Sequence, residues 1–154
     1  MPRIYLDSNI YIYGLHHRDS DSAFILHECR KGTITVIQSD YLVDEVLNWH
    51  KRNLGKDWVG KATIFMVAFL KMEFIQDSEW KLQYPKWKDL IDDKDDIPHV
   101  CSYFAGGCDC FVTTNRKLTQ MKICQHVAFQ SPEEFAKAMP KYQTGFKPDD
   151  EFWW

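Results

Sequence analysis

The amino-acid sequence predicts an α/β protein of three layers, in which helices cover both faces of a central, mostly parallel sheet of about five strands. The first observation is that short apolar, often β-branched runs alternate with longer segments of helical periodicity. The second is that the connections are short, as they are between parallel strands and their crossover helices. The third is that acidic or amide side chains stand where several segments end.

The chain begins with a predicted strand and two predicted helices. Residues 3–7 are apolar and form a buried strand, after which Ser8 and Asn9 open a short helix. Residues 19–32 carry apolar side chains at helical spacing. This second helix is expected to stop at Gly32, because glycine readily adopts the left-handed conformation that ends many helices.

The next part of the chain is expected to supply two more strands and two more helices. The β-branched residues 33–37 predict the second strand. Ser39 or Asp40 then caps the helix that follows. Residues 58–72 are strongly apolar, so we expect a helix that is buried on most sides. Residues 73–76 form a short third strand.

The remaining elements complete the alternation. Residues 77–95 are polar and are expected to be a surface connection with one helical turn. A helix then covers residues 96–104, with a proline in its first turn. Residues 111–113 and 127–129 are the fourth and fifth strands, and Ser131 caps the last helix.

The bulk composition indicates one soluble globular domain. The chain has 154 residues, of which 45% are hydrophobic and 27% are charged, and we expect a domain over residues 1–140 and a C-terminal tail over 141–154. No run approaches the roughly 20 apolar residues of a membrane span, so we expect no membrane partner and a cytoplasmic location. The net charge of −3 excludes a protein that coats nucleic acid, but not a nuclease with an acidic metal site. The tail closes with Phe152, Trp153 and Trp154, which could contact the domain or a partner.

Cysteine and histidine recur between residues 99 and 126. The five cysteines of the chain show no C-x-x-C spacing, so we expect buried thiols rather than structural zinc or a disulfide framework. The histidines His16, His17 and His99 are expected to be packing or surface residues.

Four residues form the candidate catalytic set: Asp7, Glu45, Asp96 and Asn115. Asp7 and Asn115 follow predicted strands, and the carboxyl ends of parallel strands meet at one edge of the sheet. Mg²⁺ and Mn²⁺ prefer oxygen ligands, so Asp7, Glu45 and Asp96 are predicted to bind one of these ions, with Asp93 in reserve. A bound cation would activate water for hydrolysis and neutralise a scissile phosphate. An amide is a weaker ligand than a carboxylate, so Asn115 leaves undecided whether the site binds one cation or two.

Each of these residues also has a simpler interpretation. Asp7 and Asp96 could do no more than cap the helices that follow them, and Glu45 could be an ordinary surface glutamate. Tyr11 and Tyr13 follow the first acidic residue. They could stack on single-stranded bases or belong to the core.

Five motifs follow one another along residues 3–139. They are Asp-Ser-Asn at 7–9, a helix with one glutamate at 39–47, Asp-x-x-Asp-x-Pro at 93–98, a strand that ends in Thr-Thr-Asn at 107–118, and a Ser-Pro-Glu-Glu turn at 130–135. In this order they resemble the PIN-domain ribonucleases, including VapC-like proteins. Each motif is weak alone, and their order makes the resemblance fairly specific.

The resemblance implies a PIN-like fold and a metal-dependent endoribonuclease that hydrolyses phosphodiester bonds of RNA, most naturally single-stranded RNA. It implies that Ser8, Asn9 and Thr113 orient the cation ligands through hydrogen bonds. It also implies that the chain could be the toxin of a toxin–antitoxin pair, with an antitoxin protein as partner, and that it forms homodimers.

Cationic side chains near the candidate site would hold the phosphates of RNA without selecting a base sequence. They are Lys51, Arg52, Arg116 and Lys117. An alternative is a non-catalytic PIN-like module that binds RNA or protein, suggested by Asn115 and by the acidic net charge. A phosphoacceptor or phosphatase-like domain ranks below both, because no second aspartate lies two residues after Asp7.

Overall fold

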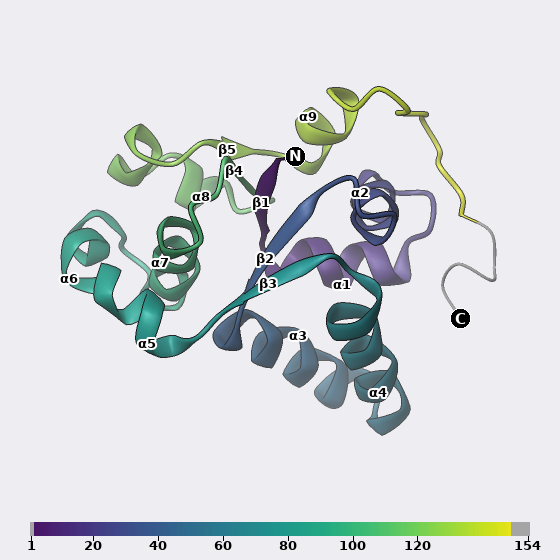
Figure 1. Cartoon of the computed structure of the whole chain (residues 1–154), viewed down its shortest axis with the longest axis horizontal. Coiled ribbons are helices and arrows are strands. Elements are labelled where there is room, and N and C mark those ends of the chain that lie inside the picture. The colour runs from purple at the N-terminus through teal and green to yellow at the C-terminus, as the bar shows by residue number, and fades with distance from the viewer. Residues whose placement is uncertain (1, 149–154) are drawn as a thin grey trace.

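The computed structural model describes residues 2–148 and contains a sheet of five parallel strands (Figure 1). The strand order is β3-β2-β1-β4-β5, so β1 lies in the centre. The strands are β1 (Arg3–Leu6), β2 (Thr35–Ser39), β3 (Met72–Ile75), β4 (Cys110–Val112) and β5 (Phe129–Gln130). Because β1 and β4 are neighbours, the residues that follow them meet at one edge of the sheet.

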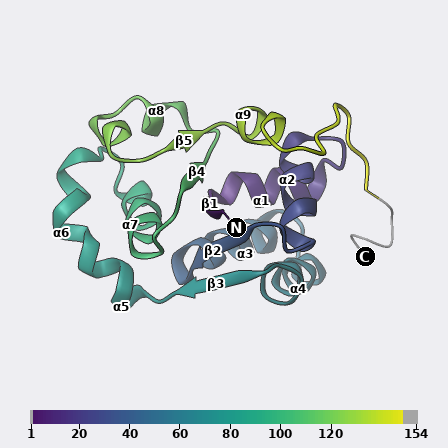
Figure 2. The same ribbon diagram turned by 45° about the horizontal axis from the view of Figure 1, so that its top comes forward.

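Helices cover both faces of this sheet, which confirms the predicted three-layer α/β/α class. Figures 1 and 2 show helices α1 to α4 on one side and α5 to α7 on the other. The longer helices are α1 (Ser8–His16), α2 (Asp21–Arg30), α3 (Asp40–Asn53), α4 (Lys56–Ile64), α7 (Ile97–Ala105) and α9 (Pro132–Lys137). The short helix α8 (Arg116–Thr119) and the 3₁₀ turn η5 (Lys122–Gln125) join β4 to β5. Within residues 2–148, no helix combines the length and apolar character that a membrane crossing requires.

Serine caps set the starts of three helices. The side chains of Ser20, Ser39 and Ser131 accept backbone N–H groups in the first turns of α2, α3 and α9. The predicted caps at Ser39 and Ser131 are therefore confirmed. Ser39 also ends β2, so the path from strand to helix turns at a single residue.

The core lies around the central strand. Tyr5 of β1 and Phe111 of β4 are fully buried, and their ring centroids are 5.0 Å apart. Two glycines allow neighbouring elements to approach closely. A Cβ atom at Gly14 would lie 2.7 Å from Leu26 Cδ1 on α2, and one at Gly106 would lie 2.6 Å from Ile37 Cγ2 on β2. Substitution at either position would therefore force neighbouring elements apart.

Two sequence predictions were wrong in detail. Residues 58–72 do not form one buried helix, because α4 ends at Ile64, the π-helix η1 (Phe65–Phe69) follows, and Ile64 and Val67 are 51% and 53% exposed. Residues 77–95 are more than a surface connection with one helical turn. They form α5 (Asp77–Trp80), η2 (Lys81–Gln83), α6 (Tyr84–Trp87) and η3 (Lys88–Leu90), and η4 (Lys94–Asp96) begins within them.

The tryptophans of this segment explain the second error. Trp80 and Trp87 are buried, and the indole N–H groups donate to Asp40 Oδ1 at 2.9 Å and Gln83 Oε1 at 3.1 Å. Each ring therefore combines apolar burial with a satisfied polar atom, which anchors a segment that is polar on average.

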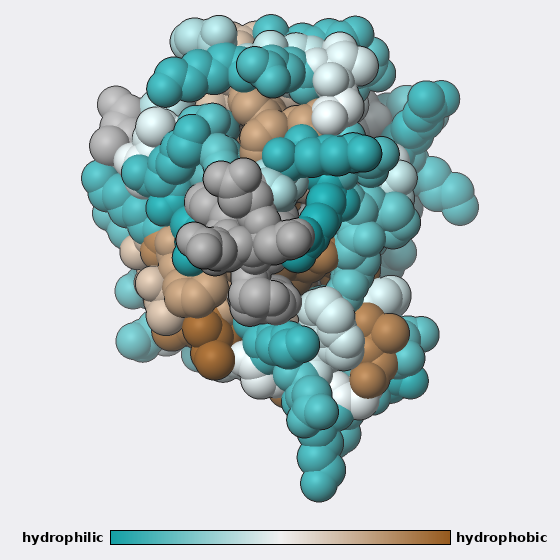
Figure 3. Space-filling model, turned by 90° about the vertical axis from the view of Figure 1, so that its right-hand side faces the viewer, coloured by the Kyte–Doolittle hydropathy of each residue, from teal (hydrophilic) through white to brown (hydrophobic). Residues whose placement is uncertain are grey.

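The start of the predicted tail packs on α2. Phe24 makes edge contacts with Tyr142 and Phe146, at centroid distances of 5.6 and 5.4 Å. Phe152, Trp153 and Trp154 lie outside the described residues. The face shown in Figure 3 is largely hydrophilic, with separate small hydrophobic areas, and scattered apolar atoms of this kind are ordinary on protein surfaces.

The thiols are free. Cys29, Cys101 and Cys110 are buried, as expected, whereas Cys108 is partly buried and Cys124 is exposed.

Candidate metal centre

Asp7 lies at the carboxyl end of the central strand, where two neighbouring elements hold it. Its N–H group donates to Val112 O at 3.0 Å, which continues the ladder between β1 and β4. Asp7 is 6% exposed, and its carboxylate accepts from Ser8 N at 2.8 Å and from Thr113 Oγ1 at 2.7 Å. One oxygen thus caps α1, as the simpler interpretation had it, and the other faces β4.

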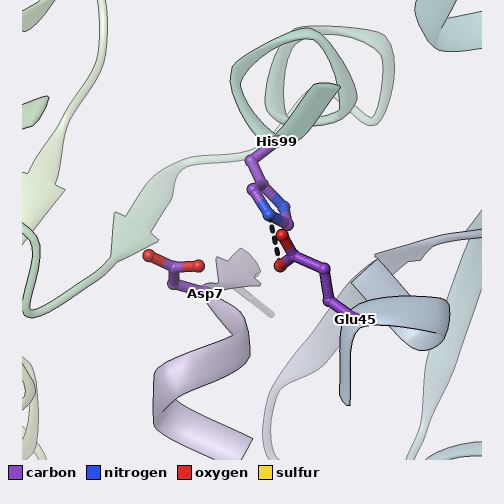
Figure 4. A group of neighbouring side chains, drawn as sticks. All are labelled: Asp7, Glu45 and His99. Atoms are coloured by element: carbon purple, nitrogen blue, oxygen red, sulfur yellow. Dashed lines mark hydrogen bonds and ion pairs between the residues drawn. The ribbon is translucent and has the colours of Figure 1, made fainter. Parts of the chain in front are cut away.

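Glu45 and His99 complete a compact group with Asp7 (Figure 4). Glu45 projects from α3, and its Oε1 lies 2.8 Å from His99 Nε2 on α7. One ligand atom from each of the three side chains lies within 4.8 Å of the other two. Figure 4 shows the two carboxylates pointing into the same space beside the imidazole.

The prediction for His99 was therefore incomplete. This residue is 3% exposed, but it makes polar contacts in the acidic group rather than simply filling space. Nothing in the sequence pairs it with Glu45, which is 54 positions away. The available signal was its spacing from Asp96, since residues three apart on a helix share a face.

Asp96 stands at the start of α7 with its side chain unused by the helix, because it makes no capping hydrogen bond. Burial, followed by the charges of Asp93 and Asp7, raises the pKa of Asp96 to about 6. Asn115 Nδ2 contacts its carboxylate only at long range, 3.4 to 3.5 Å. Asp96 is thus a carboxylate whose neighbours disfavour its ionised form, and a cation beside it would reverse that preference.

Asn115 does cap a helix, and this cap fixes the direction of its amide. Its Oδ1 accepts from Leu118 N at 3.2 Å in α8, so the amide cannot turn over without placing two donors against each other. The NH₂ group consequently faces Asp96, and the oxygen is already engaged. The backbone N–H of Asn115 donates to Thr113 Oγ1 at 3.0 Å, which links it to the hydroxyl that holds Asp7.

The negative charges of the carboxylates also shift the pKa values of one histidine and one tyrosine, His99 and Tyr41. Burial lowers the pKa of His99, but the hydrogen bond to Glu45 and the charge of Asp7 outweigh it, and the net pKa is raised. Burial, with the charges of Glu45 and Asp95, raises the pKa of Tyr41 to about 12. The site therefore has an electric potential that favours positive charge.

The other predicted residues lie at varied distances from this group. Asp93 is exposed, and its Oδ1 accepts from Asp95 N at 2.9 Å. Asn9 is exposed in the first turn of α1, and no contact places it beside the carboxylates. Tyr11 is fully buried, so it cannot stack on bases. Tyr13 is 51% exposed, and its ring stacks on His17 at 3.9 Å.

Two open cavities meet at Asn115. One, of about 780 Å³, is lined by Asp93, Asp96, Asn115 and Lys117, among others. The other, of about 1510 Å³, is lined by Thr113, Asn115 and Arg116 together with parts of α2 and α9.

The remaining predicted cations lie on α3. Lys51 and Arg52 are exposed near its C-terminal end. They stand six and seven residues after Glu45, roughly 9 to 10 Å along the helix axis.

The donor set suits a hard divalent cation. Asp7 and Glu45 converge, Asp96 is coupled to both by charge, and carboxylate oxygens are the preferred ligands of Mg²⁺ and Mn²⁺. A structural zinc site would need thiolates, and the group contains none.

Comparison with protein families identifies one match over most of the chain. A family model described as PIN domain matches residues 3–117. Among curated protein sequences, none is significantly similar to this chain.

Solved structures share the fold at low sequence identity. VapBC2 from Rickettsia felis, bound to a DNA fragment from its promoter, has a chain with TM-score 0.63 and 16% identity, and the match covers 84% of this chain and 98% of that one. VapBC-1 from nontypeable Haemophilus influenzae gives a TM-score of 0.63 and 16% identity, with coverages of 85% and 98%. VapC20 from Mycobacterium tuberculosis, a toxin that cleaves the sarcin-ricin loop, gives 0.52 and 12%, with coverages of 70% and 86%.

Proposed function

The chain belongs to the PIN domain family, and from that premise we propose that it is a metal-dependent endoribonuclease that hydrolyses phosphodiester bonds of RNA. The observation that carries the proposal is the convergence of Asp7 and Glu45 at the carboxyl edge of the sheet, with Asp96 coupled to both. Buried and half-buried carboxylates repel one another unless a cation joins them. The repulsion among these carboxylates therefore supports a cation site at this position.

Asp7, Glu45 and Asp96 would hold Mg²⁺ or Mn²⁺, with Asp93 as a further carboxylate at the open side. When bound, the cation supplies neutralisation of the scissile phosphate and activation of water. Thr113 and Ser8 keep the Asp7 carboxylate fixed through their hydrogen bonds.

The RNA would follow the two cavities that meet at Asn115. Arg116 lines one of them and Lys117 the other, so both can pair with phosphates on either side of the reacting group. Lys51 and Arg52 would contact a more distant part of the strand. These contacts are with the backbone, so they would hold the RNA without selecting its sequence.

A toxin role is the biological setting we propose. It is supported by the shared fold with the VapBC and VapC20 structures. By analogy, the partners would be a protein antitoxin and a second copy of the chain, in the cytoplasm.

A second candidate is a non-catalytic module that uses the same cleft to bind RNA or protein. It is favoured by Asn115, whose NH₂ group rather than an oxygen faces Asp96. Cleavage measurements separate the two candidates.

The test is cleavage of a fluorescent single-stranded RNA with Mn²⁺, Mg²⁺ or EDTA. Wild type is expected to cut only with a cation, and Asp7→Asn and Asp96→Asn are expected to abolish cutting. Asp57→Asn, an exposed carboxylate at the start of α4, is the matched control and should cut normally. Wild type that does not cut with either cation, or cutting that survives both substitutions, would favour the binding module.

A further inference from the structure

A chain of hydrogen bonds runs from the acidic group into the core. His99 Nε2 lies 2.8 Å from Glu45 Oε1, and His99 Nδ1 lies 2.6 Å from Tyr5 Oη. Tyr5 Oη in turn lies 3.3 Å from Ser39 Oγ. Tyr5 and Ser39 are fully buried and His99 is 3% exposed, so protein groups rather than bulk water must satisfy these atoms.

Both ends of this chain are fixed by neighbours. Ser39 Oγ accepts from Leu42 N at 3.1 Å as the cap of α3, so its own proton is available to Tyr5. An ionised Glu45 can only accept, so His99 Nε2 must carry a proton to make the short contact with it.

The middle of the chain then follows. The neutral form of His99 has one N–H group, so in that form, with Nε2 protonated, the Nδ1 atom accepts. Tyr5 is the donor to it, and burial, which raises the pKa of Tyr5 well above its usual range, keeps the phenol protonated. With His99 neutral, every proton therefore has one consistent place: Ser39 donates to Tyr5, Tyr5 to His99, and His99 to Glu45.

We propose that His99 is a positioning residue, which holds Glu45 by Oε1 and turns Oε2 toward the cation, while Tyr5 and Ser39 keep the imidazole in the Nε2–H tautomer. This proposal rests on the proposed function in one respect, because it assumes that Glu45 binds a cation. A free glutamate side chain has several rotamers, and its side chain here is 32% exposed. Anchoring one oxygen lowers the entropy that cation binding would otherwise cost.

Tyr5→Phe tests the arrangement with little change in volume. It removes the donor to Nδ1, so the Nδ1–H tautomer becomes competitive and its unprotonated Nε2 would face the Glu45 carboxylate. Tyr11→Phe is the matched control, because Tyr11 is equally buried and its hydroxyl accepts from Gln38 Nε2 at 3.2 Å. Both variants lose one buried hydroxyl, but only Tyr5→Phe removes a hydroxyl from the hydrogen-bond series that ends at Glu45.

Two readouts are needed: the tautomer of His99 by ¹⁵N NMR, and the Mn²⁺ dissociation constant by calorimetry. Wild type and Tyr11→Phe should show protonated Nε2 and equal Mn²⁺ affinity. Tyr5→Phe should show mixed tautomers and an affinity reduced roughly 10- to 100-fold, as for other groups that orient a metal ligand. His99→Gln, which keeps an N–H donor, should retain more affinity than His99→Leu.

Three results would overturn the proposal. The first is that Tyr5→Phe keeps the wild-type tautomer and affinity. The second is that His99 Nε2 loses its proton when Mg²⁺ binds, because it would then be a ligand itself, and the third is that the wild-type protein binds no cation. A protein that shows the expected tautomers and affinities but does not cut RNA would refute the nuclease proposal and leave the role of His99 intact.

Discussion

Asp96→Asn should stabilise the metal-free protein, although the same substitution should abolish cutting. Asp96 has a pKa of about 6, against 3.8 for an ordinary aspartate, so ionising it at pH 7 costs the native state at most roughly 3 kcal/mol. Because Asp96 is only half-buried, solvent screening reduces this figure, and we expect about 1.5 kcal/mol. The substitution removes this cost and sacrifices no helix cap, since the Asp96 side chain makes no capping bond.

The sign of the pH dependence follows from the same pKa. In the metal-free protein the raised pKa of Asp96 makes folding less favourable as pH rises from about 3.8 through about 6, and the loss is constant above that range. The stabilisation by Asp96→Asn should therefore be full at pH 7 and about a third as large at pH 4.5.

The assay is urea unfolding in EDTA at pH 7 and pH 4.5. In thermal unfolding, the same gain of about 1.5 kcal/mol corresponds to a rise of roughly 3 to 6 °C in Tm for a chain of this size. Asp44→Asn, an exposed neighbour of Glu45 on α3, controls for the loss of one negative charge and should change stability by less than about 0.5 kcal/mol. A less stable Asp96→Asn protein at pH 7, or a gain that is equal at both pH values, would refute the electrostatic reasoning.

Three further predictions concern the cation and the helix packing. The Mn²⁺ affinity of wild type should fall about tenfold between pH 7 and pH 5, because Asp96, whose pKa is about 6, becomes protonated. Calorimetry at both pH values checks this, and an affinity that does not depend on pH would contradict it. Asn115→Asp should raise the affinity for Mn²⁺ or the number of bound Mn²⁺ ions, as measured by calorimetry, because it adds a carboxylate beside Asp96. For the same reason it should lower the stability of the metal-free protein in urea. Gly14→Ala should destabilise the fold by roughly 1 to 3 kcal/mol in urea, because the new Cβ would lie 2.7 Å from Leu26 Cδ1. Gly60→Ala on α4, where nothing lies within 4 Å, should instead be neutral or stabilising.

The order of elements could be predicted because its signals are local. Apolar runs, serine caps and glycine stops act over a few residues, so the five strands and the main helices were found within a few positions. The segment over residues 77–95 could not be predicted from its average polarity. Its structure depends on Trp80 and Trp87, which are anchored by particular hydrogen bonds.

The candidate site divides in the same way. Asp7 and Asn115 could be located because each follows a strand, and strand ends meet at one edge. The role of His99 depends on contacts with Glu45 and Tyr5, which are 54 and 94 positions away. The direction of the Asn115 amide depends on its cap of the four-residue helix α8, and no hydrophobic pattern indicates so short a helix.

The central claim is that Asp7, Glu45 and Asp96 together form a divalent-cation site, and a Mn²⁺ titration at pH 7 tests it most directly. Wild type and Asp44→Asn should bind the ion with the same affinity, whereas Asp7→Asn and Glu45→Gln should each bind at least about tenfold more weakly. Equal binding by all four proteins, or no binding by wild type, would contradict the claim.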